Sequence, residues 1–292
     1  MSITQPCVAI ITVTYNSHDF INDYLAAITP FIRNNPHRLF IIDNASTDDT
    51  CSLIQQHCQL QQLSNHVQMI KLPQNLGFGQ GCNAGIEAAR SFSPSHFWLL
   101  NPDTRVFNDS GNALLTCMQQ HPNIDFSGSL LVNSENVPRA GAFRFPRIPN
   151  VILSALKIGI VDRLFSQHTT AIPIKNKPYP ADWLTGASFM VKAECLYQLK
   201  GFDPAYFLYF EEVDLFYRAQ QANFSVWACP DSRVFHISGA STGVSNNKKT
   251  NQRLPTYWFE SRRYYYSKNH GRLYSALTDI ALITCTTLWN IR

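Results

Sequence analysis

The chain has 292 residues, 45% of them hydrophobic, which is enough to bury the core of one large domain or of a domain with an extension. Its formal net charge of +4 is small and is not gathered into long basic runs, so nucleic acid is not an expected partner. The eight cysteines show no paired CxxC spacing, and several lie inside apolar runs. This favours reduced thiols and a cytoplasmic location over a disulfide framework.

Short apolar runs alternate with longer segments of helical periodicity over the first 131 residues. The apolar runs predict buried strands at 8–13, 39–43, 67–72, 97–100 and 126–131. The periodic segments predict helices at 19–33, 48–63, 80–91 and 110–121. This alternation favours an α/β fold with a mostly parallel central sheet flanked by helices. In such sheets ligands bind beyond the carboxyl ends of the strands.

Polar residues follow the first two predicted strands. Thr14 and Asn16 can bond the edge of a base or ribose, and Tyr15 between them can stack on a ring. Asp43, followed by Asn44, can accept from an imide N–H or a ribose hydroxyl. The alternative is that these segments only cap the next helix, through Ser17 in the first and through Ser46 or Asp48 in the second.

The third and fourth strands also end in polar segments. The run NLGFGQGCN at 75–83 places three alternating glycines at a helix start, where backbone amides approach an anion or a flat ring closely. Its spacing is not the dinucleotide-binding GxGxxG. The fourth strand runs into NPDT at 101–104, where Asp103 is placed to hold Mg²⁺ or Mn²⁺ against a diphosphate. Each segment alone favours a structural role, but their joint occurrence favours a ligand site.

The second half is less regular. Six prolines between 138 and 180 enclose an amphipathic stretch at 151–165, which predicts an insertion or lid. The segment 183–191 predicts a strand around Gly186 and leads to FLYFEEVDLFYR at 207–218. Its acids, Glu211, Glu212 and Asp214, stand in an apolar setting that raises a carboxyl pKa toward neutrality and suits a general base. The alternative is an acidic first turn of a helix, which complements the macrodipole.

The C-terminal segment 273–292 repeats Leu273, Leu277 and further apolar residues at helical spacing and predicts an amphipathic helix. Packing on the protein is favoured over contact with a membrane surface, and no run is long and apolar enough to span a membrane. Upstream, Arg262 and Arg263 belong to a basic, aromatic cluster. Contact with a diphosphate or an anionic lipid-linked acceptor is as well supported as a solvated helix face.

Several segments in fixed order resemble inverting family 2 glycosyltransferases, closest to bacterial rhamnosyltransferase-like members. They are TVTYNS, DNASTDDT, NLGFGQGCNAGI, LLNPDT, DWLTGASFMVK, GFDPAYFLYFEEVDL and the VFH at 234–236. The resemblance covers about residues 7–270. It implies a glycosyltransferase-A type fold with one catalytic domain at 1–272, in which a nucleotide-binding half (about 1–131) joins an acceptor-binding half (about 132–272). The helix at 273–292 follows that domain.

The resemblance also implies roles for individual residues. The nucleoside would be held by Thr14, Tyr15, Asn16, Asp43 and Asn44. The nucleotide and sugar pocket would be lined by Asn75, Gly77, Phe78, Gly79 and Asn83. Donor-sugar and acceptor contacts would come from Trp183 and Gly186, and a diphosphate contact from Arg263.

The implied metal and base residues depart from the family's usual pattern at two positions. Asp103 matches the last acid of the DxD metal motif, Asn101 stands where its first acid is common, and His236 matches a histidine that completes the site. Magnesium or manganese is therefore the implied cofactor. Glu212 matches an acid that is usually Asp and is the expected base, with Glu211 supporting the site or the acceptor. Asp214 is expected to cap the next helix and orient the loop.

The implied reaction moves a single sugar from a nucleotide-diphospho-sugar to a hydroxyl of a glycan or lipid-linked acceptor, in the synthesis of cell-surface polysaccharide. dTDP-rhamnose is the first candidate donor and UDP-hexoses are the second. The chain lacks the QxxRW element of processive synthases, so single addition is expected. The expected location is cytoplasmic, with peripheral contact to the inner face of the membrane. The alternative is a catalytically degenerate nucleotide-sugar-binding protein.

Overall fold

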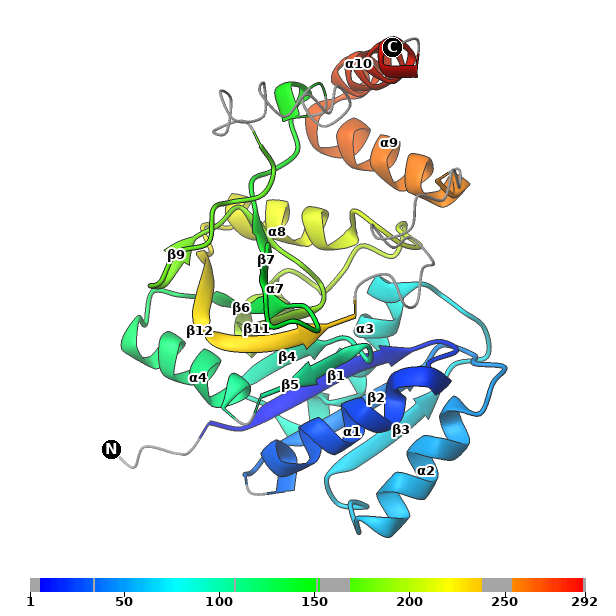
Figure 1. The fold of residues 1–292 in the computed structure, drawn as a ribbon, viewed down its shortest axis with the longest axis vertical. Helices are drawn as coiled ribbons and strands as arrows, with labels where there is room; N and C mark the ends of the chain where they lie inside the picture. Colours follow the sequence, from blue (N-terminus) through cyan, green and yellow to red (C-terminus); the bar gives the residue numbers. More distant parts are fainter. Residues whose placement is uncertain are drawn as a thin grey trace.

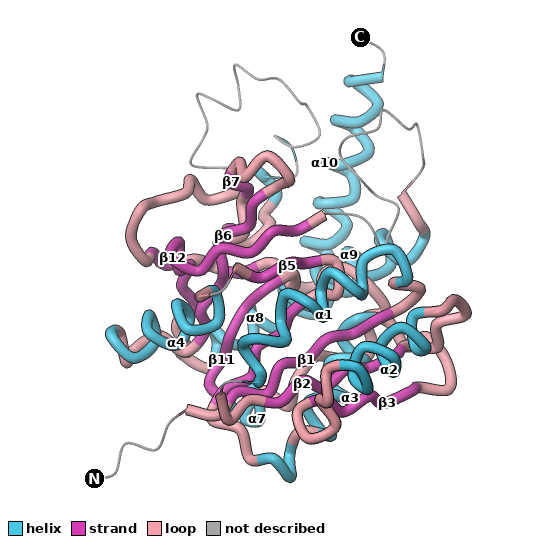
Figure 2. The backbone as a smooth tube through the Cα atoms, turned by 60° about the horizontal axis from the view of Figure 1, so that its bottom comes forward, coloured by secondary structure: helices cyan, strands magenta, loops and turns pink. Residues whose placement is uncertain are grey.

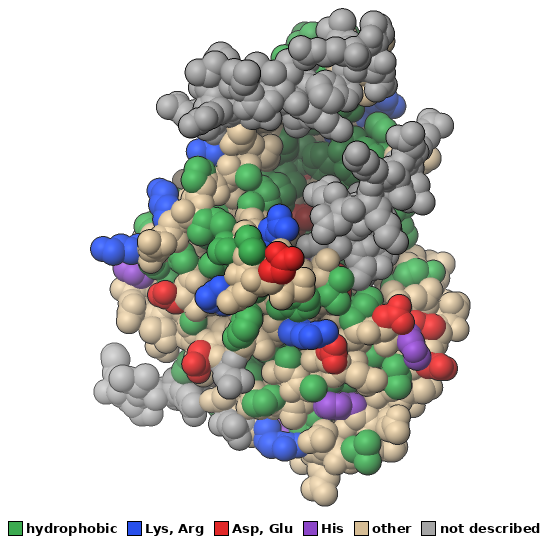
Figure 3. Space-filling view, in the orientation of Figure 1, with side chains coloured by type: hydrophobic (Ala, Val, Ile, Leu, Met, Phe, Trp, Pro, Cys, Tyr) green, Lys and Arg blue, Asp and Glu red, His purple; other side chains and the backbone are tan. Residues whose placement is uncertain are grey.

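The computed structural model describes residues 6–33, 35–107, 109–150, 152, 169–237 and 254–290. Its main feature is a ten-stranded sheet in the order β3-β2-β1-β4-β11-β6-β12-β5, with β7 beside β6 and β9 beside β12 (Figure 1). On the face seen in Figure 3, acidic and basic side chains are interspersed. The predicted stretch at 151–165 lies outside the described residues, Ile152 excepted.

The first half is a parallel sheet with helices on both faces, as predicted. Its strands are β1 (Val8–Thr14), β2 (Arg38–Asp43), β3 (Val67–Lys71) and β4 (His96–Leu100). Its helices are α1 (His18–Arg33), α2 (Thr50–Leu60), α3 (Phe78–Ala88) and α4 (Ser110–Gln120), with a 3-10 turn, η1 (Arg90–Phe92), after α3. Ile10 packs into the core on one sheet face and Ile11 into the core on the other, since neighbouring side chains of a strand point in opposite directions.

The two cores assign the helices to faces. Residues of α1, α2 and α4 belong to one core, and residues of α3, α7 (Ala193–Gln198), α8 (Glu211–Gln221) and α9 (Thr256–His270) belong to the other. A sheet covered on both faces needs apolar side chains at nearly every strand position, which accounts for the continuous apolar runs in the sequence.

The second half extends the same sheet with mixed strand directions. β11 (Ser188–Lys192) lies antiparallel between β4 and β6 (Phe126–Val132). β12 (Val226–His236) runs parallel to β6, with a register shift between Cys229 and Arg233, and pairs with β5 (Thr104–Val106) at its far side. The remaining short strands are β7 (Pro138–Arg139), β8 (Ala142–Phe143), β9 (Tyr179–Pro180) and β10 (Trp183–Leu184).

The single strand predicted at 183–191 is wrong in one respect, because it is two strands in different sheets. β10 pairs with β8 in a separate two-stranded sheet, and β11 enters the main sheet. The chain turns between them at Thr185, where the backbone N–H of Ala187 donates to Thr185 Oγ1 at 3.3 Å. Gly186 lies within this turn.

α9 and α10 (Arg272–Asn290) form a hairpin on the outer side of α8, and α10 stands clear of the sheet (Figures 1 and 2). Gly271 separates them with a φ of 89°, a conformation that glycine adopts without steric cost. The helix predicted at 273–292 is thus confirmed as far as Asn290, the last described residue. Within the described part of the chain, no helix combines the length and apolar character needed to cross a membrane.

Candidate active site

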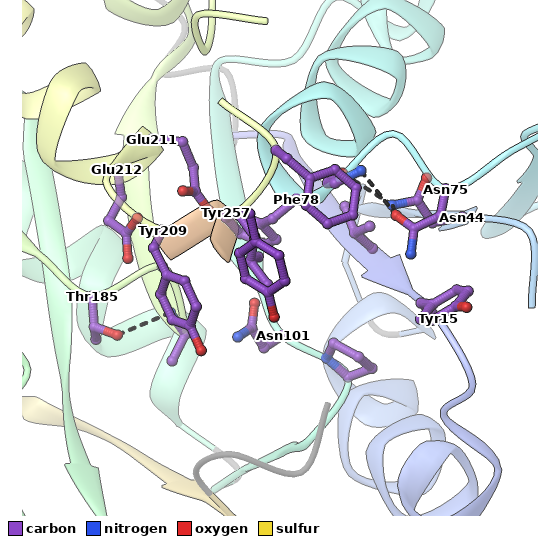
Figure 4. Close-up of a pocket in the computed structure, with 17 residues that line it drawn as sticks. Tyr15, Asn44, Asn75, Phe78, Asn101, Thr185, Tyr209, Glu211, Glu212 and Tyr257 are labelled. Carbon is purple, nitrogen blue, oxygen red and sulfur yellow. Dashed lines mark hydrogen bonds between the residues drawn. The ribbon is translucent and has the colours of Figure 1, made fainter. Parts of the chain in front are cut away.

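A cavity of about 420 Å³ opens where the carboxyl ends of β1 and β4 meet the glycine-rich start of α3 and the start of α8 (Figure 4). Its position agrees with the expectation that ligands bind beyond the ends of parallel strands. It is lined by Val13, Tyr15, Asn44, Asn75, Gly77, Phe78, Asn101, Pro102, Thr185, Gly186, Ala187, Phe207, Leu208, Tyr209, Glu211, Glu212 and Tyr257.

One wall is a turn braced by two asparagines. The Asn44 Nδ2 donates to Asn75 Oδ1 at 2.9 Å and to the carbonyl of Gly77 at 3.0 Å, while Asn44 Oδ1 accepts from the backbone N–H of Leu76 at 2.9 Å. The Asn75 Oδ1 also accepts from the backbone N–H of Gly77 at 2.9 Å. Because these groups bond the turn, both side chains shape the cavity and fix the start of α3.

The loop before α8 is held in an unusual conformation. Tyr209 and Phe210 have φ values of 67° and 66°, and non-glycine residues in this region cost roughly 1–3 kcal/mol each. Phe210 packs into an aromatic cluster, with its ring centroid 5.9 Å from Trp258 and 5.6 Å from Tyr265. Tyr209 lines the cavity instead. The two left-handed residues thereby turn the chain so that α8 begins with its acids at the cavity wall.

Glu211 and Glu212 form a carboxylate pair at this wall. Glu211 is only 2% exposed, and the Oε2 atoms of both residues accept no hydrogen bond from the described residues. Burial raises the pKa of both carboxyls, and the nearby charge of Glu212 raises the pKa of Glu211 further, well above its ordinary value of 4.5. The pair therefore holds its protons to a higher pH than ordinary carboxyls do, which suits a general base.

We expect Glu211→Gln to stabilise the protein more as pH rises. Below the ordinary pKa, Glu211 is protonated in folded and unfolded chains alike. Above it, the unfolded chain releases the proton and the folded chain keeps it, so the wild type loses stability as pH rises. A neutral glutamine removes this loss. Urea denaturation of both proteins at about pH 5 and about pH 8 measures the effect, and an equal difference at both pH values would contradict it.

The third acid lies outside the cavity. Asp214 is fully buried, and its Oδ1 accepts from Lys268 Nζ at 2.7 Å and Asn269 Nδ2 at 3.0 Å. Its Oδ2 accepts from Arg218 Nε at 2.8 Å. These bonds tie α8 to α9 from the side away from the cavity. Asp214 is therefore an anchor of the helix that carries the acids, and neither its predicted capping role nor a catalytic role has support in these contacts.

The expected metal residues lie together beneath the cavity. Asp103 Oδ2 is 3.3 Å from His236 Nε2, and Asp103 is 4% exposed. The Asp103 Oδ1 and the Asn101 Oδ1 are buried and accept no hydrogen bond from the residues that the structure covers. These two oxygens, together with the neighbouring His236 imidazole, fit a divalent cation whose remaining ligands are diphosphate oxygens. Within the same part of the chain, no three His, Cys, Asp or Glu side chains form a larger cluster.

The structure brings about half of the predicted site residues to the cavity. Those that line it are Tyr15, Asn44, Asn75, Gly77, Phe78, Asn101, Gly186, Glu211 and Glu212. Thr14, Asn16 and Asp43 lie just behind it and bond the polar turns: Thr14 Oγ1 donates to Asp43 Oδ1 at 3.3 Å, and Asn16 Oδ1 accepts from the Thr47 N–H at 2.8 Å. They support the cavity instead of lining it.

The other predicted residues have structural partners away from the cavity. Asn83 exchanges two 2.8 Å hydrogen bonds with the backbone of Phe202, and Gly79 packs beside the Phe202 side chain. Trp183 stacks on Phe143 with ring centroids 4.3 Å apart. Arg263 is 69% exposed at its side chain and pairs with an acid of α10, which favours the solvated-face alternative for this residue.

Sequence reasoning missed the aromatic wall that faces the acids. Tyr209 and Tyr257 stack with ring centroids 6.0 Å apart and an interplanar angle of 16°, and Phe207 meets Tyr257 edge-on at 5.5 Å. Tyr257 comes from the first turn of α9. Its only local signal is the proline at 255, which suits a helix start but says nothing of the cavity.

Comparison with known proteins places this geometry in a family. The N-acetylglucosaminyl-diphospho-decaprenol L-rhamnosyltransferase of Mycobacterium tuberculosis is 26% identical over 245 residues, covering 80% of this chain and 77% of that protein. The rhamnosyltransferase WbbL of Escherichia coli K12 is 24% identical over 242 residues, covering 79% of this chain and 83% of that protein.

Two solved structures share the fold. GalNAc-T7 with UDP, GalNAc and Mn²⁺ superposes with a TM-score of 0.62 at 13% identity, over 99% of this chain and 55% of the solved one. This chain therefore spans about half the length of that relative. The mannosyltransferase PcManGT of Pyrobaculum calidifontis, with GDP-Man and Mn²⁺, gives 0.60 at 14% identity, over 98% and 74%. The predicted glycosyltransferase-A type fold is thus confirmed.

The family model described as Glycosyl transferase family 2 matches residues 9–195, which is more than half of the chain. The matched region includes β1, the glycine-rich turn and the Asn101–Asp103 motif. The resemblance inferred from the sequence motifs is therefore confirmed, and the chain belongs to glycosyl transferase family 2.

Proposed function

We propose that this protein transfers one sugar, with inversion, from a nucleotide-diphospho-sugar to a hydroxyl of a glycan acceptor in cell-surface glycan synthesis. The observation that carries the proposal is the buried Glu211–Glu212 pair, which faces a cavity at the carboxyl ends of β1 and β4. Inversion requires a base on the acceptor side to remove the hydroxyl proton as the anomeric carbon is attacked. The family membership supports the same reaction class.

The two ends of the cavity suit the two substrates. Tyr15 lies beside Asn44 and Asn75 at one end, where its 40% exposed ring is available to stack on a nucleobase (Figure 4). Glu212 lies with Tyr209 at the opposite end. We assign the first end to the donor nucleotide and the second to the acceptor.

Gly186 keeps the passage between these ends open. A Cβ at this position would lie 3.1 Å from the Phe78 ring and 4.0 Å from Glu212 Oε1. The donor sugar is proposed to lie in this space, within reach of the base.

Asp103, Asn101 and His236 would hold a divalent cation against the donor diphosphate. When bound, this cation supplies positive charge to the departing diphosphate. The described cavity lining contains no Lys or Arg that serves the same purpose. The chain's own contribution is to hold the Asp103 carboxylate directly after Asn101 and Pro102, which line the cavity. There it pairs with His236, and its Oδ1 accepts no hydrogen bond from the described residues.

Rhamnose is the proposed sugar, on the support of two relatives whose names specify rhamnosyl transfer. Incubating the purified chain with dTDP-rhamnose, UDP-hexoses and GDP-mannose, with Mg²⁺ or Mn²⁺, tests the proposal through release of nucleoside diphosphate. Metal-dependent turnover of dTDP-rhamnose alone is expected. Turnover of another donor would overturn the rhamnose assignment, and absence of donor binding would favour a degenerate protein.

We propose that the Tyr209–Tyr257 wall binds the apolar face of an acceptor sugar ring. Tyr257→Ala is then expected to raise the acceptor KM about ten-fold while the donor Kd is unchanged, because the substitution removes one face of the stack. Phe259→Ala is a matched control, since Phe259 is on the same helix but is absent from the cavity lining. An equal change in donor and acceptor binding would count against the assignment.

A further inference from the structure

The outermost helix, α10, has its apolar side turned outward. Leu273, Leu277, Ile280 and Ile283 are 77%, 46%, 60% and 65% exposed. Their spacing of four, three and three residues places them in one row along the helix. We call these four residues the α10 stripe. The helix packs on the protein, as expected, but Leu273 and Leu277 do not lie on its packed side.

The side of α10 that packs on the protein is mixed: Tyr274, Ala281 and Leu282 pack against the core, and polar residues lie beside them. Ser275 and Thr278 are 3% and 0% exposed, and the Thr278 carbonyl accepts from Arg262 Nη2 at 2.8 Å. Asp279 pairs with Arg262 and, at 3.1 Å, with Arg263. The α10 stripe is therefore a second apolar face, whereas a surface helix in water typically has one apolar face, which is turned inward. An outward apolar row is expected where a second, less polar phase covers it.

The charges beside the α10 stripe and the small area of the stripe favour a membrane surface as the partner that covers it. Arg272, at the start of α10 and next to Leu273, is exposed. The acid beside the stripe, Asp279, is paired with both Arg262 and Arg263. Positive charge beside an apolar row suits anionic lipid headgroups. A second copy of the chain is less suited, since four aliphatic side chains of roughly 100 Å² each supply about half of the ~800 Å² per partner of a stable interface.

The direction of α10 links the stripe to the cavity. The Tyr274 ring contacts those of Tyr266 and His270, and Asp279 bonds Arg262, so α10 runs back along α9 toward its first turn. That first turn carries Tyr257, which lines the cavity. The α10 stripe and the acceptor end of the cavity therefore belong to the same α9–α10 hairpin.

We propose that the α10 stripe seats in the headgroup region of a membrane containing anionic lipid, and that the acceptor sugar is carried on a lipid in that membrane. The second part rests on the proposed function, whereas the first depends only on the stripe. Membrane seating brings the acceptor end of the cavity to the place where a lipid-borne hydroxyl is found.

Flotation of the full chain with vesicles tests the seating. Vesicles of phosphatidylcholine alone are compared with vesicles that also contain phosphatidylglycerol. Ile280→Glu/Ile283→Glu should lower binding to the anionic vesicles about ten-fold or more, because it places two charges in the stripe. Leu60→Glu is the matched control, since Leu60 is 73% exposed on α2 and is remote from α10. It should bind as the wild type does.

Three results would overturn the proposal: no vesicle binding by the wild type, equal binding by the double variant, or a wild-type dimer that the double variant dissociates. The last would assign the stripe to a second copy. Donor-nucleotide binding without vesicles, measured on the same samples, should be equal in all three proteins. If the wild type does not bind the donor nucleotide, the result counts against the proposed function. The vesicle-binding result would still test the membrane contact.

Discussion

Glu212→Gln is expected to lower kcat by about 10²–10⁴-fold, the range that a positioned general base contributes, while the donor Kd stays within about two-fold. The glutamine keeps the shape of the side chain but cannot accept the acceptor's proton. Because the carboxyl is buried and its pKa is raised, the variant should unfold at a temperature no lower than that of the wild type. Single-turnover kinetics with a defined acceptor, together with calorimetric titration of the donor nucleotide, measure both effects.

Glu212→Asp serves as the companion variant, because it keeps a carboxylate and shortens its reach by one methylene. Partial activity is expected from this variant. The apparent pKa of the acid limb of its pH–rate profile should lie above the ordinary pKa of a carboxyl group. The raised pKa of Glu212 makes the wild type lose activity on acidification at a higher pH than an ordinary glutamate would. Full activity of Glu212→Gln would remove Glu212 from the mechanism.

Gly77→Ala is expected to cost about 3–5 kcal/mol of unfolding free energy and nearly all activity. A Cβ at Gly77 would stand 1.7 Å from the Phe207 carbonyl oxygen, and the φ of 84° disfavours any other residue. The obstructing atom belongs to the backbone, so relief requires the chain at Phe207 to move. That chain leads into Tyr209 and the acids, which links the stability loss to the activity loss.

Gly271→Ala is the control that separates the effect of backbone strain from the effect of the clash with Phe207. Gly271 has a similar φ of 89°, but nothing lies within 4 Å of the position of its Cβ. This variant should lose about 1–3 kcal/mol and retain kcat. Thermal denaturation and initial rates of both variants make the comparison, and equal losses of activity would contradict a role for the Gly77–Phe207 contact.

The first half of the fold is readable from sequence because its strands are buried on both faces. Such strands leave continuous apolar runs, and the four parallel strands lie within about two residues of their predicted bounds. β12 left no such signal, since it contains Pro230 and Asp231 near its register shift. The antiparallel insertion of β11 depends on pairing between distant segments, which periodicity within one segment does not encode.

Residues of the candidate site were predictable where the local backbone of a single motif determines their position. Gly77 and Glu212 lie in contiguous motifs whose backbone shape sets their place. Asn83 shows the limit: an amide adjacent to a glycine-rich turn is as able to bond a neighbouring loop as a ligand, and here it bonds Phe202. Tyr257 reaches the cavity only through the packing of α9, which the sequence around it does not specify.

The anchor at Asp214 sets an order of events on the ribosome. Asp214 leaves the exit tunnel well before Lys268, which lies 54 residues further along. Until then its carboxylate lacks one of its two cations, and desolvating a charge that is incompletely paired is unfavourable. We therefore expect the helix that bears the acids to dock after the parallel strands β1–β4 have been translated. Its final docking is expected to wait until Lys268 has been translated.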